Sequence, residues 1–143
     1  MIRKVIAYIT TKDKLLVLSH PYSPEAGLQV PSGTVNEGEL VENAVMREVL
    51  EETGLKDVRI ESYLGKSKFL YLNLNHDRYC FYFHLICNQK TPSRWRIEEK
   101  KPSALSEGEE YPIIFELYWI PIREGMVKLS TYYGKFLYKI NWN

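Results

Sequence analysis

Three glutamates near the middle of the chain have the residue type and the spacing needed to bind a metal ion. Glu48, Glu51 and Glu52 are separated by three and four positions, so on an α-helix their carboxylates share one face. Like charges at such spacings cost about 0.2–0.5 kcal/mol per pair when no counterion is present. A hard divalent cation prefers several charged oxygen ligands. The cluster therefore predicts a Mg²⁺ site, with Mn²⁺ as an alternative ion.

One basic residue accompanies these glutamates. Arg47 stands four residues before Glu51, where it can orient that carboxylate. A glutamate pair near a helix end is most often a solvated surface, and taken alone the pair favours that interpretation. The surrounding glycines favour a built site instead, because Gly33 and Gly38 bracket a turn before the helix and Gly54 follows it.

The element that must hold these side chains is a helix. Residues 39–53 contain neither glycine nor proline, and Gly54 is a natural C-cap. The face away from the glutamates is apolar and is expected to pack on the core. Its members are Val45, Met46, Val49 and Leu50.

The rest of the chain predicts a sheet for this helix to pack on. Residues 3–10 and 14–19 indicate a β-hairpin across the polar turn at 11–13. Residues 89–110 are polar and predict a long loop, which is often functional. This order predicts an α/β fold with a mixed sheet and helices packed on it. Further strands are expected at 57–72, 79–88 and 112–120, and a closing helix, weakened by Gly134, at 127–140.

Length and composition limit the remaining classes. The chain has 143 residues, of which 45% are hydrophobic, which predicts one domain over residues 1–143. Nineteen basic and 18 acidic residues nearly balance, so no overall field favours nucleic acid or a membrane surface. No apolar run approaches the ~20 residues of a membrane span, and the N-terminus lacks the features of a secretory signal. A cytoplasmic protein is expected.

The segment at residues 33–55 resembles the Nudix box. That motif is a glycine, five residues, a glutamate, seven residues, and then Arg-Glu-apolar-any-Glu-Glu-any-Gly-apolar. Every fixed position is filled, although the motif covers only this part of the chain. The matching residues are Gly33, Glu39, Arg47, Glu48, Val49, Glu51, Glu52, Gly54 and Leu55.

The resemblance implies a fold and an activity. Nudix proteins are mixed-sheet α/β/α sandwiches that commonly hydrolyse a nucleoside diphosphate linked to another group. By resemblance, Glu48, Glu51 and Glu52 bind Mg²⁺, Arg47 holds these glutamates, and Glu39 lies in the outer shell of the site. Bound magnesium acts as a Lewis acid and activates water, and Glu48 is the first candidate for the base that takes the proton.

One position before the box departs from the family. Many relatives have Pro-Gly-Gly, whereas this chain has Pro31-Ser32-Gly33. The carbonyl before the box glycine often binds the metal, so Ser32 is expected to supply it. Serine tolerates positive φ less well than glycine, which affects the expected loop geometry and not the reaction class.

Substrate recognition is less specified by the sequence. Some family members take their base from a later loop, and Glu109 or Glu110 is the choice here because both stand near the strand at 112–120. A solvated acidic loop is the alternative. Tyr71 is a candidate substrate contact, because dinucleoside polyphosphate hydrolases of the family often have a tyrosine after the box. Trp95 could stack on a base, and its neighbours Arg94 and Arg96 could contact phosphates.

The sequence is compatible with two other functions. Some Nudix relatives are nucleotide-sensing or binding modules, but such drift usually removes a box glutamate and none is missing here. Isomerases and repair glycosylases on this fold usually need extra domains. The expected partner is therefore a small nucleotide-like diphosphate, without a membrane or a specific nucleic acid. Dimers are common among relatives, which leaves a homodimer open.

Overall fold

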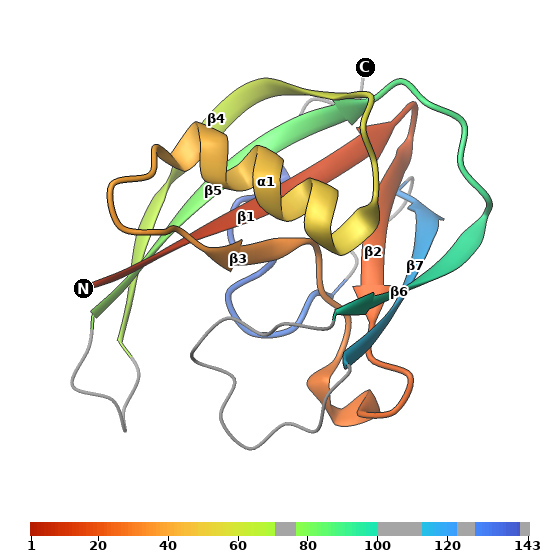
Figure 1. Ribbon diagram of the computed structural model, residues 1–143, viewed down its shortest axis with the longest axis horizontal. Helices are drawn as coiled ribbons and strands as arrows, with labels where there is room; N and C mark the ends of the chain where they lie inside the picture. Colours follow the sequence, from red (N-terminus) through yellow and green to blue (C-terminus); the bar gives the residue numbers. More distant parts are fainter. Residues whose placement is uncertain (71–76, 100–112, 123–127, 141–143) are drawn as a thin grey trace.

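The computed structural model describes residues 1–70, 77–99, 113–122 and 128–140, and Figure 1 shows a mixed sheet with the helix α1 across it. The α/β fold with a mixed sheet is confirmed. Its strands are β1 (Ile2–Thr11), β2 (Lys14–Ser19), β3 (Ser32–Thr34), β4 (Val58–Leu70), β5 (Asp77–Cys87), β6 (Arg94–Glu99) and β7 (Ile113–Pro121). The helices are α1 (Val41–Thr53) and two short 3-10 helices, η1 (Pro24–Ala26) and η2 (Leu137–Lys139).

The central strand is β1. The strand order is β4-β5-β1-β2-β7-β6, with β3 paired to β1 beside this path. The β1 and β5 strands run parallel, while the other pairs are antiparallel. The hairpin of β1 and β2 was predicted and is confirmed. Since β2 joins β1 only near Thr10 and Thr11, the first half of β1 is left to pair with β3.

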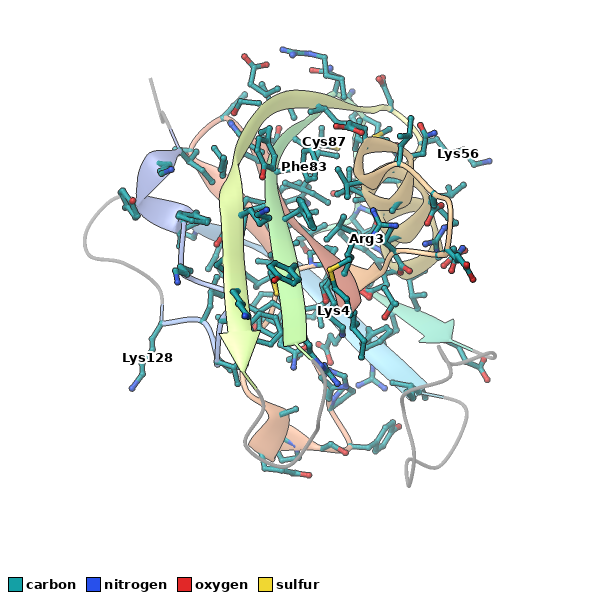
Figure 2. The ribbon with its side chains drawn as sticks, turned by 90° about the vertical axis from the view of Figure 1, so that its left-hand side faces the viewer. Arg3, Lys4, Lys56, Phe83, Cys87 and Lys128 are labelled. Atoms are coloured by element: carbon teal, nitrogen blue, oxygen red, sulfur yellow. The ribbon has the colours of Figure 1, made fainter. Side chains whose placement is uncertain are left out.

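The sheet buries a separate apolar cluster on each face. Side chains alternate along a strand, so Val5 and Ala7 pack with α1, whereas Ile6 and Tyr8 pack with residues 129–140. Figure 2 shows the consequence, with α1 on one side of the sheet and the C-terminal segment on the other. We call this segment, residues 128–140, the C-terminal cover.

Local sequence explains where α1 ends. Gly54 has φ +76°, the left-handed conformation of a helix C-cap, and its N–H donates to the carbonyl of Leu50. The Thr53 hydroxyl donates to the Val49 carbonyl at 2.6 Å and accepts from the Leu55 N–H at 3.0 Å. These bonds satisfy the last turn of α1. The helix begins at Val41, two residues later than the predicted start.

The predicted closing helix at 127–140 is wrong for the residues that the structure describes there. The C-terminal cover consists of turns and the 3-10 helix η2. Its backbone bonds to tyrosines of the sheet: Tyr82 donates to the Tyr132 carbonyl at 2.8 Å, and Tyr8 donates to the Tyr133 carbonyl. These tertiary bonds take carbonyls that an α-helix would have used, and Gly134 lowers helix propensity further.

The predicted long loop at 89–110 is wrong for its middle part, because Arg94–Glu99 forms β6. This strand pairs antiparallel with β7. Its sequence alternates, so Trp95 and Ile97 pack on the core of the α1 face, while Arg94 and Arg96 are exposed. Alternation of apolar and polar residues is the pattern that indicates a half-buried β-strand.

The opposite edge of the sheet is formed by β4, which among the described strands pairs with β5 alone. Its ladder has irregularities between Ile60 and Ser62 and between Tyr63 and Gly65. Within the described ranges, no helix is long and apolar enough to cross a membrane.

Candidate metal and catalytic site

Arg47 is the centre of the hydrogen-bond network on α1. Its guanidinium donates two bonds to Glu39, at 2.9 and 2.8 Å. It also donates to Glu48 at 2.8 Å and to Glu51 at 3.3 Å. A further bond, at 2.9 Å, reaches the Thr34 carbonyl on β3. A planar guanidinium has five N–H donors in a fixed fork, so this one side chain joins the helix to the neighbouring strand.

Glu39 is the most strongly perturbed carboxylate of the group. Its pKa is lowered to about 2, chiefly by the bonds from Arg47 and then by the N–H of Asn36, which donates to the carboxylate at 3.0 Å. The same contact with Glu39 raises the pKa of Arg47 above its ordinary value. Glu39 is therefore ionised at all physiological pH values, and it fixes the turn before α1.

Gly33 is needed because Glu48 lies directly against it. A Cβ atom added at this position would lie 1.9 Å from the carboxyl carbon of Glu48, which no real contact allows. The Glu48 side chain is only 12% exposed. A residue without a side chain thus lets the carboxylate pack on the backbone of β3.

Glu52 binds the next residue of the same strand. Its carboxylate accepts the Ser32 N–H at 3.0 Å. Pro31 and Val35, which flank β3, make backbone hydrogen bonds to β1. Because alternate residues of an antiparallel strand bond to the same neighbour, the backbone groups of Ser32 and Thr34 point away from β1. The Ser32 carbonyl therefore lies along the outer edge of β3, the edge to which Glu52 is bonded.

These positions suit a divalent cation in the chemistry of their donors. Glu48 and Glu52 are one helical turn apart, both are held against β3, and with the Ser32 carbonyl they supply the hard oxygen donors that Mg²⁺ prefers. Glu51 does not join them here, since its side chain is 57% exposed and bonded to Arg47. Among the described residues, no three or more His, Cys, Asp or Glu side chains are gathered closely enough to hold a metal ion.

The other predicted site residues are not part of this group. Tyr71, Glu109 and Glu110 lie outside the described residues. Trp95 does not present its indole N–H to a ligand, because this group donates to the Thr53 carbonyl at 3.0 Å. Arg94 and Arg96 both pair with Glu116.

Sequence reasoning did not single out two residues that contact the site. Arg3 on β1 donates to the Glu39 carbonyl at 3.4 Å and to the Asn36 carbonyl at 3.5 Å, which ties the turn before α1 to the sheet. Tyr133 accepts from the Ser32 hydroxyl at 3.4 Å. The pattern of the box carries no signal for either residue, because both contacts come from distant parts of the chain.

Comparisons with known proteins agree with this architecture. Residues 2–133 match the NUDIX domain family. A MutT NUDIX hydrolase from Burkholderia pseudomallei is 20% identical, with a TM-score of 0.64 and 98% of each chain covered. A NUDIX hydrolase from Nitrosomonas europaea is 23% identical, with a TM-score of 0.59, over 84% of this chain and 72% of that one. An Ap4A hydrolase from C. elegans is 19% identical, with a TM-score of 0.53, over 64% of this chain and 69% of that one.

At these identities the solved structures show a shared fold, and no curated protein sequence matches the chain. The family match spans all of the described strands and the whole of α1. It includes the glycine, arginine and glutamates whose contacts are described above. The chain therefore belongs to the NUDIX domain family, and its sheet and helix have the fold of the Nudix hydrolases.

Proposed function

We propose that the protein is a Mg²⁺-dependent hydrolase that cleaves the diphosphate linkage of a nucleoside diphosphate joined to another group. The observation that carries the proposal is the fixed position of Glu48 and Glu52 against β3. Arg47 maintains it by bonding Glu39, Glu48 and the Thr34 carbonyl together. Solubility alone does not explain why Glu48 packs against Gly33 and Glu52 accepts a bond from the Ser32 N–H, because a solvated glutamate would extend into water.

The metal would be held by Glu48, Glu52 and the Ser32 carbonyl, with Glu51 as a further ligand. When bound, a divalent cation supplies charge neutralisation on the diphosphate oxygens and a water of lowered pKa. The glutamate–arginine network would hold these oxygen donors together against β3.

Glu48 is the proposed general base. It is little exposed, and a carboxylate beside the metal would take the proton from the attacking water. Arg47 positions Glu48 and Glu51 and does not touch the reacting atoms. A glutamate of the later segment, Glu109 or Glu110, remains the alternative base, and Tyr71 remains a proposed substrate contact.

The proposed substrate is a small nucleotide-like diphosphate. Its support is the family, together with the name of one solved structure of this fold, an Ap4A hydrolase. We further propose that residues 1–143 form a single Nudix domain, since the family match begins at residue 2 and ends at residue 133.

The test is phosphate release from nucleoside triphosphates, ADP-ribose, dinucleoside polyphosphates and nucleotide sugars, with Mg²⁺, Mn²⁺ or a chelator. We expect turnover of one compound, lost in chelator and lowered at least about 100-fold in Glu48→Gln. Glu52→Gln should require more metal for half-maximal activity.

The matched control is Glu42→Gln, which neutralises an exposed glutamate on the same helix and should leave turnover unchanged. Hydrolysis that survives chelation, or Glu52→Gln with an unchanged metal requirement, would show that the metal assignment is wrong. If a folded protein that binds metal hydrolyses none of these compounds, the result would instead favour a nucleotide-binding module.

A further inference from the structure

Ser32 carries a hydroxyl that the proposed hydrolysis does not use. Many Nudix proteins have a glycine at this position, and the proposed function needs only the backbone carbonyl of the residue. In this protein the Ser32 hydroxyl donates to the hydroxyl of Tyr133 at 3.4 Å. Tyr133 stands 101 residues later in the chain and belongs to the C-terminal cover. The contact therefore joins the strand of the candidate metal site to the segment that closes the other face of the sheet.

The register of β3 explains why this hydroxyl points to the C-terminal cover. Ser32 pairs with Ile6 of β1, and residues directly opposite each other in a ladder have their side chains on one face. Ile6 packs in the apolar cluster of the cover, on the side of the sheet away from α1 (Figure 2). The next residue, Gly33, faces α1, where Glu48 lies against it. The strand β3 thus lies between the glutamates and the cover.

Tyr133 is fixed at both its backbone and its ring. Its carbonyl accepts from the Tyr8 hydroxyl, and its N–H donates to the Ser130 carbonyl at 3.2 Å. Its ring stacks on that of Tyr132, with 4.8 Å between the centroids and 29° between the planes. The N–H of Ser130 in turn donates to the carbonyl of Leu28, just before β3, at 2.8 Å. A tyrosine held in this way offers its hydroxyl at a defined position.

Ser32 is held by two bonds outside the ladder of β3 with β1. Its N–H donates to the Glu52 carboxylate at 3.0 Å, and its hydroxyl donates to Tyr133. Its carbonyl belongs to the peptide that it shares with Gly33, and a glycine restricts the rotation of a peptide very little. The direction of the Ser32 carbonyl therefore depends on the contacts of Ser32 itself. Loss of either bond would widen the range of positions that this carbonyl takes.

We propose that Tyr133 is a positioning residue for the metal site. Its hydroxyl holds Ser32 so that the Ser32 carbonyl and the carboxylate of Glu52 are presented together to a divalent cation. Tyr133 is only 8% exposed, and it acts through Ser32 without contact to the metal or the substrate. This inference rests on the proposed function for the presence of the cation.

The first experiment is a titration with Mn²⁺ alone, in which electron paramagnetic resonance measures the free ion. Tyr133→Phe removes one oxygen atom and keeps the ring. It should weaken Mn²⁺ binding about two- to tenfold, because a lost neutral hydrogen bond is worth about that factor. Ser32→Ala should weaken binding to a similar extent. The double variant should bind no more weakly than either single variant, because all three lack the same contact.

Two tyrosines supply matched controls. Tyr138→Phe removes a hydroxyl of the same cover from a side chain that is 69% exposed, and it should bind Mn²⁺ like the parent protein. Tyr82→Phe removes a hydroxyl that holds the backbone of the cover, so it should lower stability and leave Mn²⁺ affinity unchanged. Equal losses of affinity in Tyr82→Phe and Tyr133→Phe would overturn the proposal, because a loosened cover would then explain both. Circular dichroism verifies the fold of each variant, and Ser32→Ala carries the test if Tyr133→Phe does not fold.

A second measurement needs no metal. Hydrogen exchange of the Ser32 amide, followed by nuclear magnetic resonance in the metal-free protein, reports on its bond to Glu52. This amide should exchange about two- to tenfold faster in Tyr133→Phe than in the parent. The amide of Val35, which donates to the Arg3 carbonyl at 2.9 Å, is the internal control and should keep its rate. Parental Mn²⁺ affinity in both Tyr133→Phe and Ser32→Ala would overturn the proposal.

Kinetics then separate this inference from the proposed function. On a hydrolysed substrate, Tyr133→Phe should need more Mg²⁺ for half-maximal activity and should retain most of kcat at saturating metal. If hydrolysis keeps the parental metal requirement in this variant, the inference fails while the hydrolase stands. If no compound is hydrolysed but Mn²⁺ affinity depends on Tyr133, the hydrolase fails while the positioning role stands. A parent protein that binds no Mn²⁺ would overturn both.

Discussion

The two faces of the sheet are covered in different ways. On one face a regular helix, α1, packs through Val45 and Val49, and its polar side directs the glutamates to β3. On the other face the C-terminal cover has little regular structure and is held by hydroxyls that rise from the sheet, those of Tyr8 and Tyr82. The helix can hold several carboxylates in fixed relative positions, while the cover mainly closes the second core. Chemistry and packing are thus expected to respond separately to substitution.

The largest expected effect is on the α1 face. Gly33→Ala puts a methyl group where the Glu48 carboxylate lies, 1.9 Å from its carboxyl carbon, so Glu48 must move. We expect kcat/KM to fall at least about 100-fold, because misplacing a catalytic group by even 1 Å has this cost.

Gly134→Ala is the matched control on the other face. Its new methyl group would meet Leu129 at an ordinary 3.6 Å. Gly134→Ala should retain activity. Equal losses of kcat/KM in Gly33→Ala and Gly134→Ala would show that the two faces do not differ in their importance for catalysis.

A smaller effect is expected from Glu39→Gln, which removes the carboxylate that holds Arg47. Residues that orient metal ligands typically contribute 10- to 100-fold, so we expect a loss of about tenfold in kcat/KM. The folded-state pKa of Glu39 is about 2, below its ordinary value of 4.5. The stability from this pair is therefore fully present above pH 4.5 and is lost as the pH falls toward 2.

The measurement for this variant is the midpoint of thermal unfolding from pH 2 to pH 6. The parent protein should lose stability in that window relative to Glu39→Gln, whose side chain does not titrate. Parallel curves for the two proteins would mean that the Glu39–Arg47 pair does not stabilise the fold.

On the face of the C-terminal cover, Tyr82→Phe should affect stability and not catalysis. It removes the hydroxyl that donates to the buried carbonyl of Tyr132. The lost bond should lower the free energy of unfolding by about 1–3 kcal/mol, as measured in urea. Turnover per folded molecule should stay at the parental level, and a fall in kcat would link the cover to the chemistry.

The smallest effect is expected at β6, away from both faces of the comparison. Arg96 is exposed and pairs with Glu116 at 3.4 Å, and exposed pairs contribute about 0–1 kcal/mol. Arg96→Gln should leave both KM and the free energy of unfolding nearly unchanged. A raised KM would restore the idea that these arginines contact phosphates.

The comparison of faces also explains what the sequence could predict. The contacts of α1 are local or periodic, so its extent was predicted to within two residues at its start, and the strands β1 and β2 followed from the same kind of pattern. The C-terminal cover was predicted to be helical, but its carbonyls bond to Tyr8 and Tyr82, far away in the chain. No local pattern encodes that competition.

Other differences have similar causes. The alternation in β6 was hidden by charged residues within a polar stretch, and only its pairing with β7 makes it a strand. In the candidate site, the motif named the glutamates and Arg47. Arg3 and Tyr133 carry no motif, because the fold alone brings them from distant parts of the chain to the site.

The edge strand β4 has a consequence for the behaviour of the protein at high concentration. A long, flat edge strand is a template on which other chains can add strands and aggregate. The 13-residue strand β4 interrupts its own ladder twice, and exposed Arg59, Glu61 and Lys66 lie along it. Bulges twist an edge away from a partner, and charges repel one. We therefore expect this long edge strand to resist pairing with neighbouring molecules, so that it offers a poor surface for fibre growth.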